Sequence, residues 1–384
     1  MANTLTNLVP SMYNALDVVS RELVGFIPAV TMDATFTRAA VGQTVTSPVT
    51  PAASAIDVTP GVNYPDVGDQ TIGNTTMTIT KARAVPIRWN GEERLGVDNN
   101  GAQYNVIFRD QVAQAMRTLT NEMESDLAGL YANASRAYGT AGTTPFASST
   151  TELMQARKIL VDNGAPFGDI QAVLDTGAGA NVRTLYGINT NRDWSQVPLN
   201  DRGVLVTPHG VSIRESGQVK IPTVGTQASA TTNAAGYAVG VTVIGLASAG
   251  TGTFVAGDVI TFAGDTNKYV VASGDTDVSN GGTITLAAPG LKKAIGTSAT
   301  AITTISAGPR SLVFARTALA LAVRAPALPE QGDSAVDRMQ ITDPISGLTF
   351  EMSMYAGRRQ MTYELAIAWG VKAVKPEHMA ILLG

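Results

Sequence analysis

The stretch of residues 100–138 carries the longest unbroken helical pattern in the chain, and it constrains the fold more than any other feature. No proline occurs between Pro86 and Pro145, so every residue in the stretch keeps its backbone donor. Apolar residues recur at steps of three and four positions, which is the period of one helix face. They are Phe108, Val112, Met116, Leu119, Met123, Leu127, Leu130 and Ala134. A helix of about 35 residues is on the order of 50 Å long, so we predict a strut across the whole structure, N-capped by Asp98 or Asn100.

Composition limits the classes of protein to which this chain can belong. A length of 384 residues predicts about two to four domains. Charged residues make up only 15%, the mean hydropathy is +0.10 and the net charge is −4. A chain with so few charged residues can bury much of its surface against other subunits. It can equally be a β-rich protein whose surface is solvated by Thr and Ser. The pI near 5.3 argues against nucleic-acid binding by phosphate neutralisation.

Two further features concern chemistry and compartment. The chain has no Cys, which excludes a disulfide framework, a thiolate metal site and a cysteine nucleophile. The N-terminus lacks a basic segment followed by an apolar run, and no stretch approaches 18 uninterrupted apolar residues. We therefore expect synthesis in the cytosol and no membrane partner.

Three patterns precede the strut. Residues 1–30 show the spacing of a short amphipathic helix, and residues 31–60 form a Thr- and Pro-rich extended arm that we expect to need a partner surface for order. Residues 61–97 alternate apolar and polar side chains, and Asn90-Gly91 is a strong two-residue turn signal. We predict a long β-hairpin excursion, with Pro86 on an edge strand.

The segments 151–222 and 309–384 are typical of an α/β domain. Helices are expected at 151–163 and 178–186, strands at 171–174, 204–206, 211–213, 339–341 and 348–355, and a final strand or helix at 363–374. The composition of the intervening residues 223–308 is different, since they contain no Arg and no Glu. Strand patterns there lie at 237–244, 259–262, 269–271 and 283–286. We predict an inserted all-β module of about six strands, closed into a small barrel.

Catalytic and ligand-binding patterns are sparse. The two histidines, His209 and His378, are far apart and lack suitably spaced acidic residues. Residues 177–182 resemble a dinucleotide-binding loop, but Val182 stands where a small residue is needed. A helix start capped by one of the two preceding polar residues is the better interpretation. We therefore predict no enzyme activity, no cofactor and no metal site.

The order of these parts resembles the major capsid (coat) protein of tailed bacteriophages, which has the Hong Kong 97-like fold. Residues 257–264 (GDVITFAG) are similar to a strand-turn run of that family's inserted domain, and residues 367–384 (IAWGVKAVKPEHMAILLG) to its closing segment. The insertion resembles the branch typified by the short-tailed Salmonella phage coat protein. Two alternatives are a β-rich surface-layer or adhesin-type protein, which does not explain the strut, and an α/β enzyme, which lacks polar site residues.

The resemblance implies an α+β fold with five parts. They are an N-terminal arm (1–56), an extended β-hairpin loop (57–97), a peripheral domain with a long spine helix (98–146 and 332–358), an axial domain (147–222, 309–331 and 359–384) and an inserted barrel-like β domain (223–308). It also implies self-assembly into pentamers and hexamers of an icosahedral shell. That procapsid would form on a scaffolding protein around a portal, and a decoration protein is a further candidate partner.

The resemblance implies where the protein acts and which residues touch neighbours. The shell would enclose double-stranded DNA without sequence-specific binding, and the chain would be made in the host bacterial cytoplasm before it enters the virion capsid. The expected inter-subunit contacts are Lys81, Arg83, Arg88, Glu92, Glu93 and Arg94 in the extended loop, and Asp265, Asn267 and Lys268 in an exposed insertion loop, 263–268. Arg suits such contacts because its planar fork matches carboxylates.

We expect the shell to be non-covalent. In the type member of the family, Lys–Asn isopeptide bonds lock the extended loop to a neighbouring subunit. Here Lys81 is the only lysine before Lys158, so a donor exists, but residues 310–384 contain no Asn to accept it. Mature particles should therefore give one monomer band on a denaturing gel. A ladder of covalent multimers would overturn this prediction.

Overall fold

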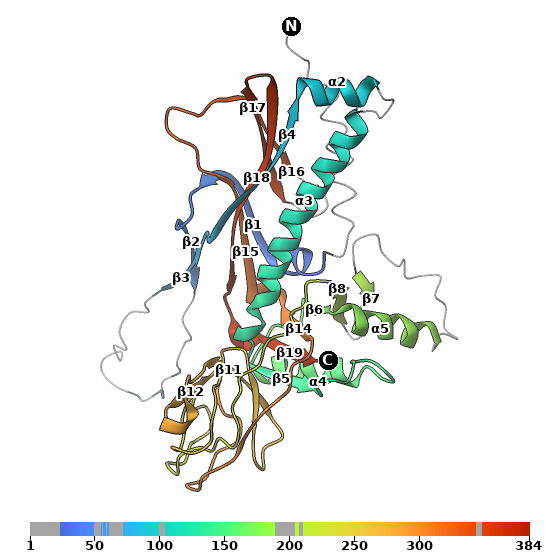
Figure 1. The fold of residues 1–384 in the computed structure, drawn as a ribbon. Helices are drawn as coiled ribbons and strands as arrows, with labels where there is room; N and C mark the ends of the chain where they lie inside the picture. Colours follow the sequence, from blue (N-terminus) through green and yellow to red (C-terminus); the bar gives the residue numbers. More distant parts are fainter. Residues whose placement is uncertain are drawn as a thin grey trace.

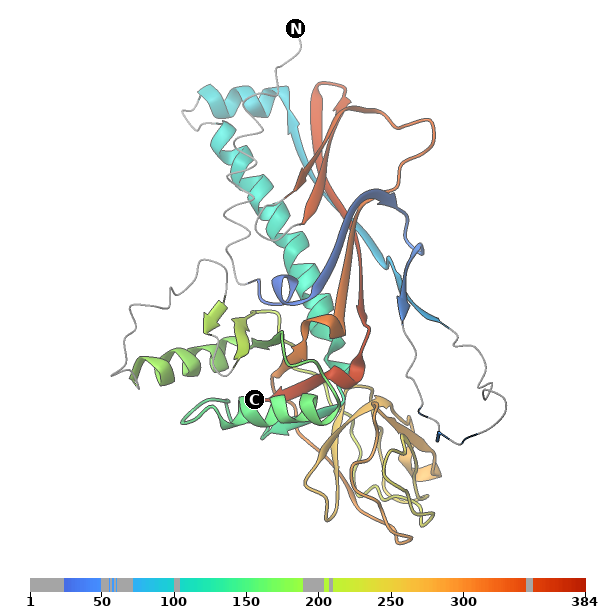
Figure 2. The ribbon, with the colours of Figure 1, turned by 180° about the vertical axis from the view of Figure 1, so that it is seen from behind.

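The computed structural model describes residues 24–49, 72–99, 104–188, 204–206, 210–342 and 348–384, together with positions 55, 57, 58 and 60. The described chain is elongated and has three parts in a row (Figure 1). A sheet crossed by helix α3 (Tyr104–Gly129) lies at one end. A mixed sheet with helices α4 (Thr151–Asp162) and α5 (Thr176–Ile188) lies in the middle, and a β module lies at the other end, as the reverse view also shows (Figure 2).

Helix α3 is the predicted strut, but it is shorter than the sequence pattern. After Gly129 the chain forms the 3-10 turn η3 (Leu130–Asn133) and then strand β5 (Arg136–Gly139). Strand β5 pairs with β19 (Met379–Leu383) in parallel. The helical pattern therefore overestimates the helix at its C-terminal end, because backbone pairing with a distant strand overrides local periodicity.

The predicted hairpin turn at Asn90-Gly91 is wrong, because helix α2 (Gly91–Asn99) begins there. The side-chain oxygen Oδ1 of Asn90 accepts a hydrogen bond from the backbone N–H of Glu93 at 2.7 Å, and Glu93 Oε2 accepts one from the N–H of Asn90 at 3.1 Å. This reciprocal pair is a capping box. Of the two expected caps of α3, Asp98 lies inside α2, and Asn100 lies outside the described residues.

Six strands form the sheet that α3 crosses. They are β1 (Thr31–Ala39), β4 (Lys81–Asn90), β15 (Leu319–Pro326), β16 (Ala335–Thr342), β17 (Thr349–Gly357) and β18 (Gln360–Ala373). The order is β1-β15-β18-β17-β16, and β4 pairs along β18 as well. Since β18 shares its backbone with three neighbours, the final apolar run is a strand. Among the described strands β4 pairs only with β18, which confirms the edge position of Pro86.

The apolar face of α3 packs on this sheet. Its large side chains are at most 2% exposed at Phe108, Val112, Met116, Leu119, Met123 and Leu127. The ring of Phe108 meets Tyr363 of β18 edge to face at 4.7 Å, and Trp369 of the same strand is fully buried. At about 1.5–3 kcal/mol for each large side chain, this face is a major source of stability.

The extended arm is ordered by its own chain where the structure describes it. Strand β1 runs parallel to β15, and β2 (Thr44–Val49) pairs with β3 (Gly73–Thr78) in a two-stranded ribbon. Strand β1 thus finds a partner surface, β15, in its own chain, whereas the ribbon of β2 and β3 has no further strand beside it among the described residues. It also follows that the predicted strands of the extended loop do not pair with each other, since β3 joins β2 and β4 joins β18. The helix expected within residues 1–30 lies mostly outside the described residues.

The middle part is a mixed sheet in the order β5-β19-β14-β6-β8-β7. Its other strands are β6 (Ile170–Leu174), β7 (Val204–Val206), β8 (Val211–Glu215) and β14 (Arg310–Ala315). The two helices and three strands predicted for residues 151–222 are present within a few residues of the expected bounds. Helix α4 buries Leu153, Ala156 and Leu160 against this sheet.

The β module contains β9 (Val243–Gly245), β10 (Val259–Phe262), β11 (Lys268–Ser273), β12 (Thr283–Leu286) and β13 (Ile302–Thr304). They pair in the order β13-β10-β11-β12-β9. Residues 230–233 hydrogen-bond both to residues 300–302 and to residues 245–247, so a ring of backbone pairing surrounds a separate apolar core. The strand predicted at 237–244 is mostly absent, because Gly240 adopts a φ of +87° and turns the chain. Strand β11 also pairs with β5, which makes the module continuous with the middle sheet.

A buried carboxylate joins three segments of the chain. Glu124 of α3 is 1% exposed, and it accepts backbone N–H groups from Gly25 (3.3 Å), Phe26 (3.1 Å) and Ile27 (2.8 Å). The hydroxyl of Ser216 donates a fourth hydrogen bond at 2.8 Å. Burial raises the pKa of Glu124 above its ordinary value, although the four hydrogen bonds oppose that shift. The start of the described arm is thus held on the strut by one side chain.

Replacing this carboxylate should have a pH-dependent effect. A raised folded-state pKa means that the folded chain binds more protons than the unfolded chain, so the ionised group costs stability as the pH rises. The stability advantage of wild type over Glu124→Gln should therefore narrow as the pH rises above 4.5. Urea unfolding of both proteins at several pH values measures this difference in the free energy of unfolding. An advantage that widens with pH would contradict the expected direction.

Candidate interaction surfaces

Some of the predicted contact residues of the extended loop already have charged partners within their own chain. The amine Nζ of Lys81 lies 3.0 Å from Glu122 Oε1 and 2.9 Å from Asp126 Oδ1, both on α3. Arg83 Nε lies 3.1 Å from the same Glu122 oxygen. Burial lowers the pKa of Lys81, but the bonds to the two carboxylates outweigh it, so the pKa is raised overall. These two cations therefore tie β4 to the strut of their own chain.

The remaining members of this group lie around α2. The guanidinium of Arg94 lies over the ring of Tyr104 at 4.8 Å, a cation–π geometry, and Glu93 belongs to the capping box. Arg88 and Glu92 are exposed and make no ion pair among the described residues. Within the part of the chain that the structure describes, the charges of Arg88 and Glu92 are therefore available to a neighbour.

The insertion loop packs against β5. Asp265 Oδ2 accepts the hydroxyl of Tyr269 at 2.6 Å, and its Oδ1 accepts the backbone N–H of Asn267 at 2.9 Å. Burial, together with Asp265, raises the pKa of Tyr269 to about 12. Asn267 Oδ1 accepts a hydrogen bond from Arg136 Nη1 at 3.2 Å, and Lys268 Nζ donates to the carbonyl of Gly139. The loop is therefore exposed only in part, and its polar side chains face a groove beside β5.

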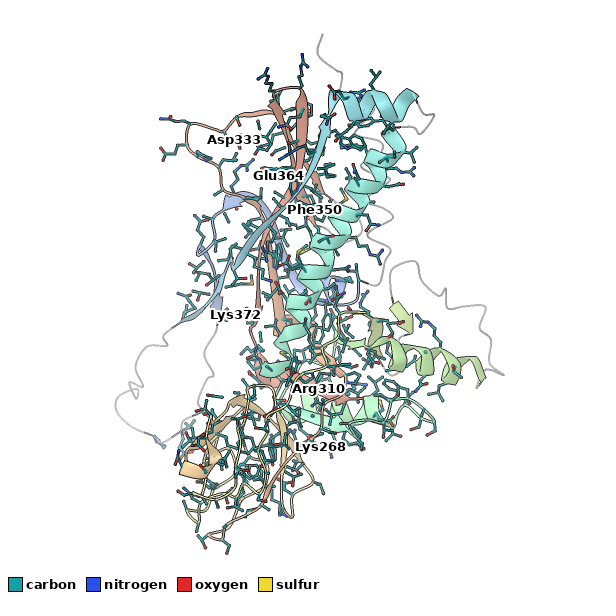
Figure 3. All side chains as sticks on the ribbon, in the orientation of Figure 1. Lys268, Arg310, Asp333, Phe350, Glu364 and Lys372 are labelled. Carbon is teal, nitrogen blue, oxygen red and sulfur yellow. The ribbon has the colours of Figure 1, made fainter. Side chains whose placement is uncertain are left out.

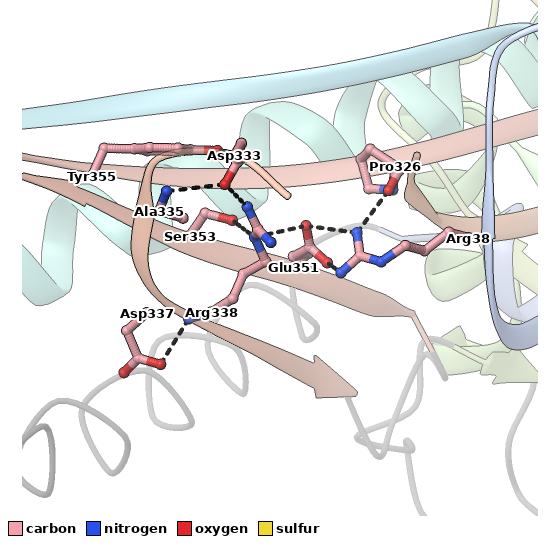
Figure 4. A network of polar contacts seen from close by, with 9 residues as sticks. All are labelled: Arg38, Pro326, Asp333, Ala335, Asp337, Arg338, Glu351, Ser353 and Tyr355. Atoms are coloured by element: carbon pink, nitrogen blue, oxygen red, sulfur yellow. Dashed lines mark hydrogen bonds and ion pairs between the residues drawn. The ribbon is translucent and has the colours of Figure 1, made fainter. Parts of the chain in front are cut away.

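A network that sequence patterns did not reveal joins the arm to the far strands (Figure 4). Glu351 of β17 is 3% exposed and binds the guanidinium of Arg38 from β1 with both oxygens. Arg338 of β16 lies 3.9 Å from Glu351 and pairs with Asp333. The backbone N–H of Ala335 is the main reason that the pKa of Asp333 is lowered. In the sequence, the one sign of this network is Glu351, a single acidic residue within an otherwise apolar and uncharged strand pattern.

The residues considered for catalysis have structural roles where they are described. Asp175 Oδ2 accepts the N–H of Gly177 at 3.0 Å and caps α5, while Val182 is fully buried in that helix. His378 lies in a 3-10 turn, and His209 lies outside the described residues. Within the described ranges, no group of three or more His, Asp or Glu side chains is arranged to hold a metal ion. No helix in these ranges is both long and apolar enough to span a membrane.

Comparisons with known proteins give structural likenesses only. No family model and no curated relative matches the chain. The chain is similar to the capsid structure of cyanophage P-SCSP1u (14% identity, 92% of this chain and 86% of that chain, TM-score 0.45) and to the capsid of the myovirus XM1 (8%, 94% and 92%, 0.45). It is also similar to a virus-like particle from Pyrococcus furiosus (9%, 97% and 97%, 0.41). All three TM-scores lie below 0.5, so the function is argued from this chain's own residues.

The two carboxylates that bind Lys81 should differ in importance. Asp126 Oδ2 also accepts the indole N–H of the buried Trp369 at 2.9 Å, so Asp126→Ala leaves a buried donor without a partner. We expect this change to cost about 1–3 kcal/mol of folding stability. Glu122→Ala removes only partly exposed ion pairs and should cost about 0–1 kcal/mol. Chemical denaturation measures the stability of both variants. Equal losses would contradict the larger role given to Asp126.

Proposed function

We propose that this chain is a non-enzymatic shell subunit, a major capsid protein of a tailed bacteriophage with the Hong Kong 97-like fold. The ribbon of β2 and β3 is the observation that carries the proposal. Among the described residues this ribbon has two strands, and most of the described side chains of β3 are exposed or half-buried. A two-stranded ribbon is at best marginally stable alone in water, so a neighbouring subunit is the natural cover for it.

The base of the ribbon is well anchored, which makes it an arm rather than a loose loop. Met77 and Ile79 are buried in a small cluster with Ala368, and Lys372 donates to the backbone carbonyl of Thr76 at 2.6 Å. The ribbon then leaves the body of the molecule (Figure 1). A rigid base and an uncovered end suit a contact that spans two subunits.

The parts of the chain take the roles proposed for such a subunit. We assign the arm to residues 1–56, the extended loop to 57–97, the peripheral domain to 98–146 and 332–358, the axial domain to 147–222, 309–331 and 359–384, and the inserted β domain to 223–308. The chain assembles as pentamers and hexamers, on a scaffolding protein and around a portal, and encloses double-stranded DNA. A net charge of −4 over 384 residues supports this, because many copies pack together without strong mutual repulsion.

Direct imaging tests the proposal. The full chain is produced in bacteria, alone and with candidate scaffolding proteins, and is examined by size-exclusion chromatography and negative-stain microscopy. We expect capsomers or closed shells, because exposed apolar side chains such as Ile72 and Val41 gain cover on assembly. A monodisperse monomer under all of these conditions would contradict the proposal. A denaturing gel of the same shells reports whether they contain covalent multimers.

A further inference from the structure

A charged cleft lies where the β module meets the middle sheet. It has a volume of about 530 Å³ and is walled by β5, α4 and the insertion loop, close to the position of Lys268 in Figure 3. Three cations line it, Arg136, Lys158 and Lys268, and two carboxylates, Glu152 and Asp162. Its charged lining therefore carries one positive charge in excess.

The guanidinium of Arg136 is held in place but only partly used. Arg136 is 6% exposed, and its Nη1 donates a hydrogen bond to Asn267 Oδ1. Nitrogens Nε and Nη2 have no hydrogen-bond partner among the described residues. The nearest carboxylate oxygen, on Asp162, is 3.8 Å from Nη2, which is too long for a hydrogen bond. These two nitrogens form the side-on edge of the guanidinium, whose parallel N–H groups fit one carboxylate.

The cations of the cleft are only partly compensated by carboxylates of their own chain. Burial lowers the pKa of Lys268, and burial also lowers that of Arg136 despite the nearby acids. The pKa of Lys81, by contrast, is raised because two carboxylates bind its amine. A buried, incompletely paired cation is unfavourable, and an added anion relieves it.

We propose that this cleft binds an acidic side chain from a second copy of the chain, which bonds to the free edge of Arg136. This inference rests on the proposed shell function. Neighbouring atoms cover Nε and Nη2, so the proposed contact requires side chains at the cleft to shift, and Asp162, which is 3.8 Å from Nη2 and 44% exposed, has room to do so. Lys158 is exposed at the rim and attracts the incoming charge. Helix α2, which carries the exposed Glu92, lies at the opposite end of the molecule from β5 and β11 (Figure 1), so Glu92 cannot reach the cleft of its own chain.

Cross-linking in assembled shells tests the contact. Shells are built from a mixture of ¹⁵N-labelled and unlabelled chains, and a carbodiimide joins amines to carboxylates that touch them. Mass spectrometry should find Lys158 or Lys268 linked to an acid in peptide pairs of mixed label, which come from two copies. Links only to Glu152 or Asp162 of the same chain, or no link at either lysine, would overturn the proposal. Failure of wild type to form any shell would instead count against the proposed function.

A matched pair of charge reversals gives an independent test. Lys158→Glu places a negative charge at the rim, whereas Arg358→Glu reverses the charge of an exposed residue between β17 and β18 that does not line the cleft. We expect shells of Lys158→Glu to dissociate at lower urea than those of Arg358→Glu, with loss of the cross-link at Lys268 between copies. Arg136→Lys keeps the charge but not the fork, and should also lose that cross-link. Equal dissociation of the two reversals would overturn the proposal.

Discussion

The contact between one face of α3 and strand β18 is the interaction on which the rest of the structure depends. Phe108 and Tyr363 meet at one end of this contact, and the buried Trp369 lies farther along β18. Because β18 also pairs with β4, β15 and β17, a helix fixed to it fixes four strands at once. The C-terminal end of α3 continues through the 3-10 turn η3 to β5 in the second sheet. One apolar stripe thus sets the distance between the two sheets.

Buried carboxylates complete what apolar packing begins. Glu124 gathers the backbone of residues 25–27 onto α3, and Glu351 holds Arg38 of β1 against β17. Each acts on the N-terminal part of the chain, where Phe26 and Ile27 are also buried in the main apolar core. Hydrogen bonds to an ionised group are stronger than neutral ones, and their geometry is specific. The arm is therefore positioned by polar bonds as well as by apolar burial.

The charged side chains fall into two kinds, and this distinction matters for assembly. Lys81 and Arg83 are neutralised by α3 of their own chain. Arg136 and Lys268 remain incompletely paired at the cleft beside the β module. A subunit that tiles with copies of itself gains most from contacts at the second kind, because the desolvation of those cations has already occurred on folding. The β module therefore contributes a charged wall as well as bulk.

Local sequence patterns were enough to predict those features that depend mainly on residues close together in the chain. The stripe from Phe108 to Leu127, the helix at 151–163, the edge position of Pro86 and the compositional break at 223 were all readable from the sequence. Three features were not: the strand formed by Arg136–Gly139, the cap formed by Asn90, and the pairing of β3 with β2. The two-residue turn signal at Asn90-Gly91 has the same residue preference as a helix start, so sequence could not separate them.

The sequence alone determined that the chain has a long amphipathic helix, little charge, no cysteine chemistry and a β-rich insertion, because periodicity and composition are local properties. Tertiary structure alone decided which charges stay unpaired. Lys81 and Lys268 look alike as isolated lysines, yet one reaches Glu122 and Asp126 while the other faces a carbonyl and a cleft. Partners separated by 41 and 129 positions are brought together only by the packing of distant strands and helices.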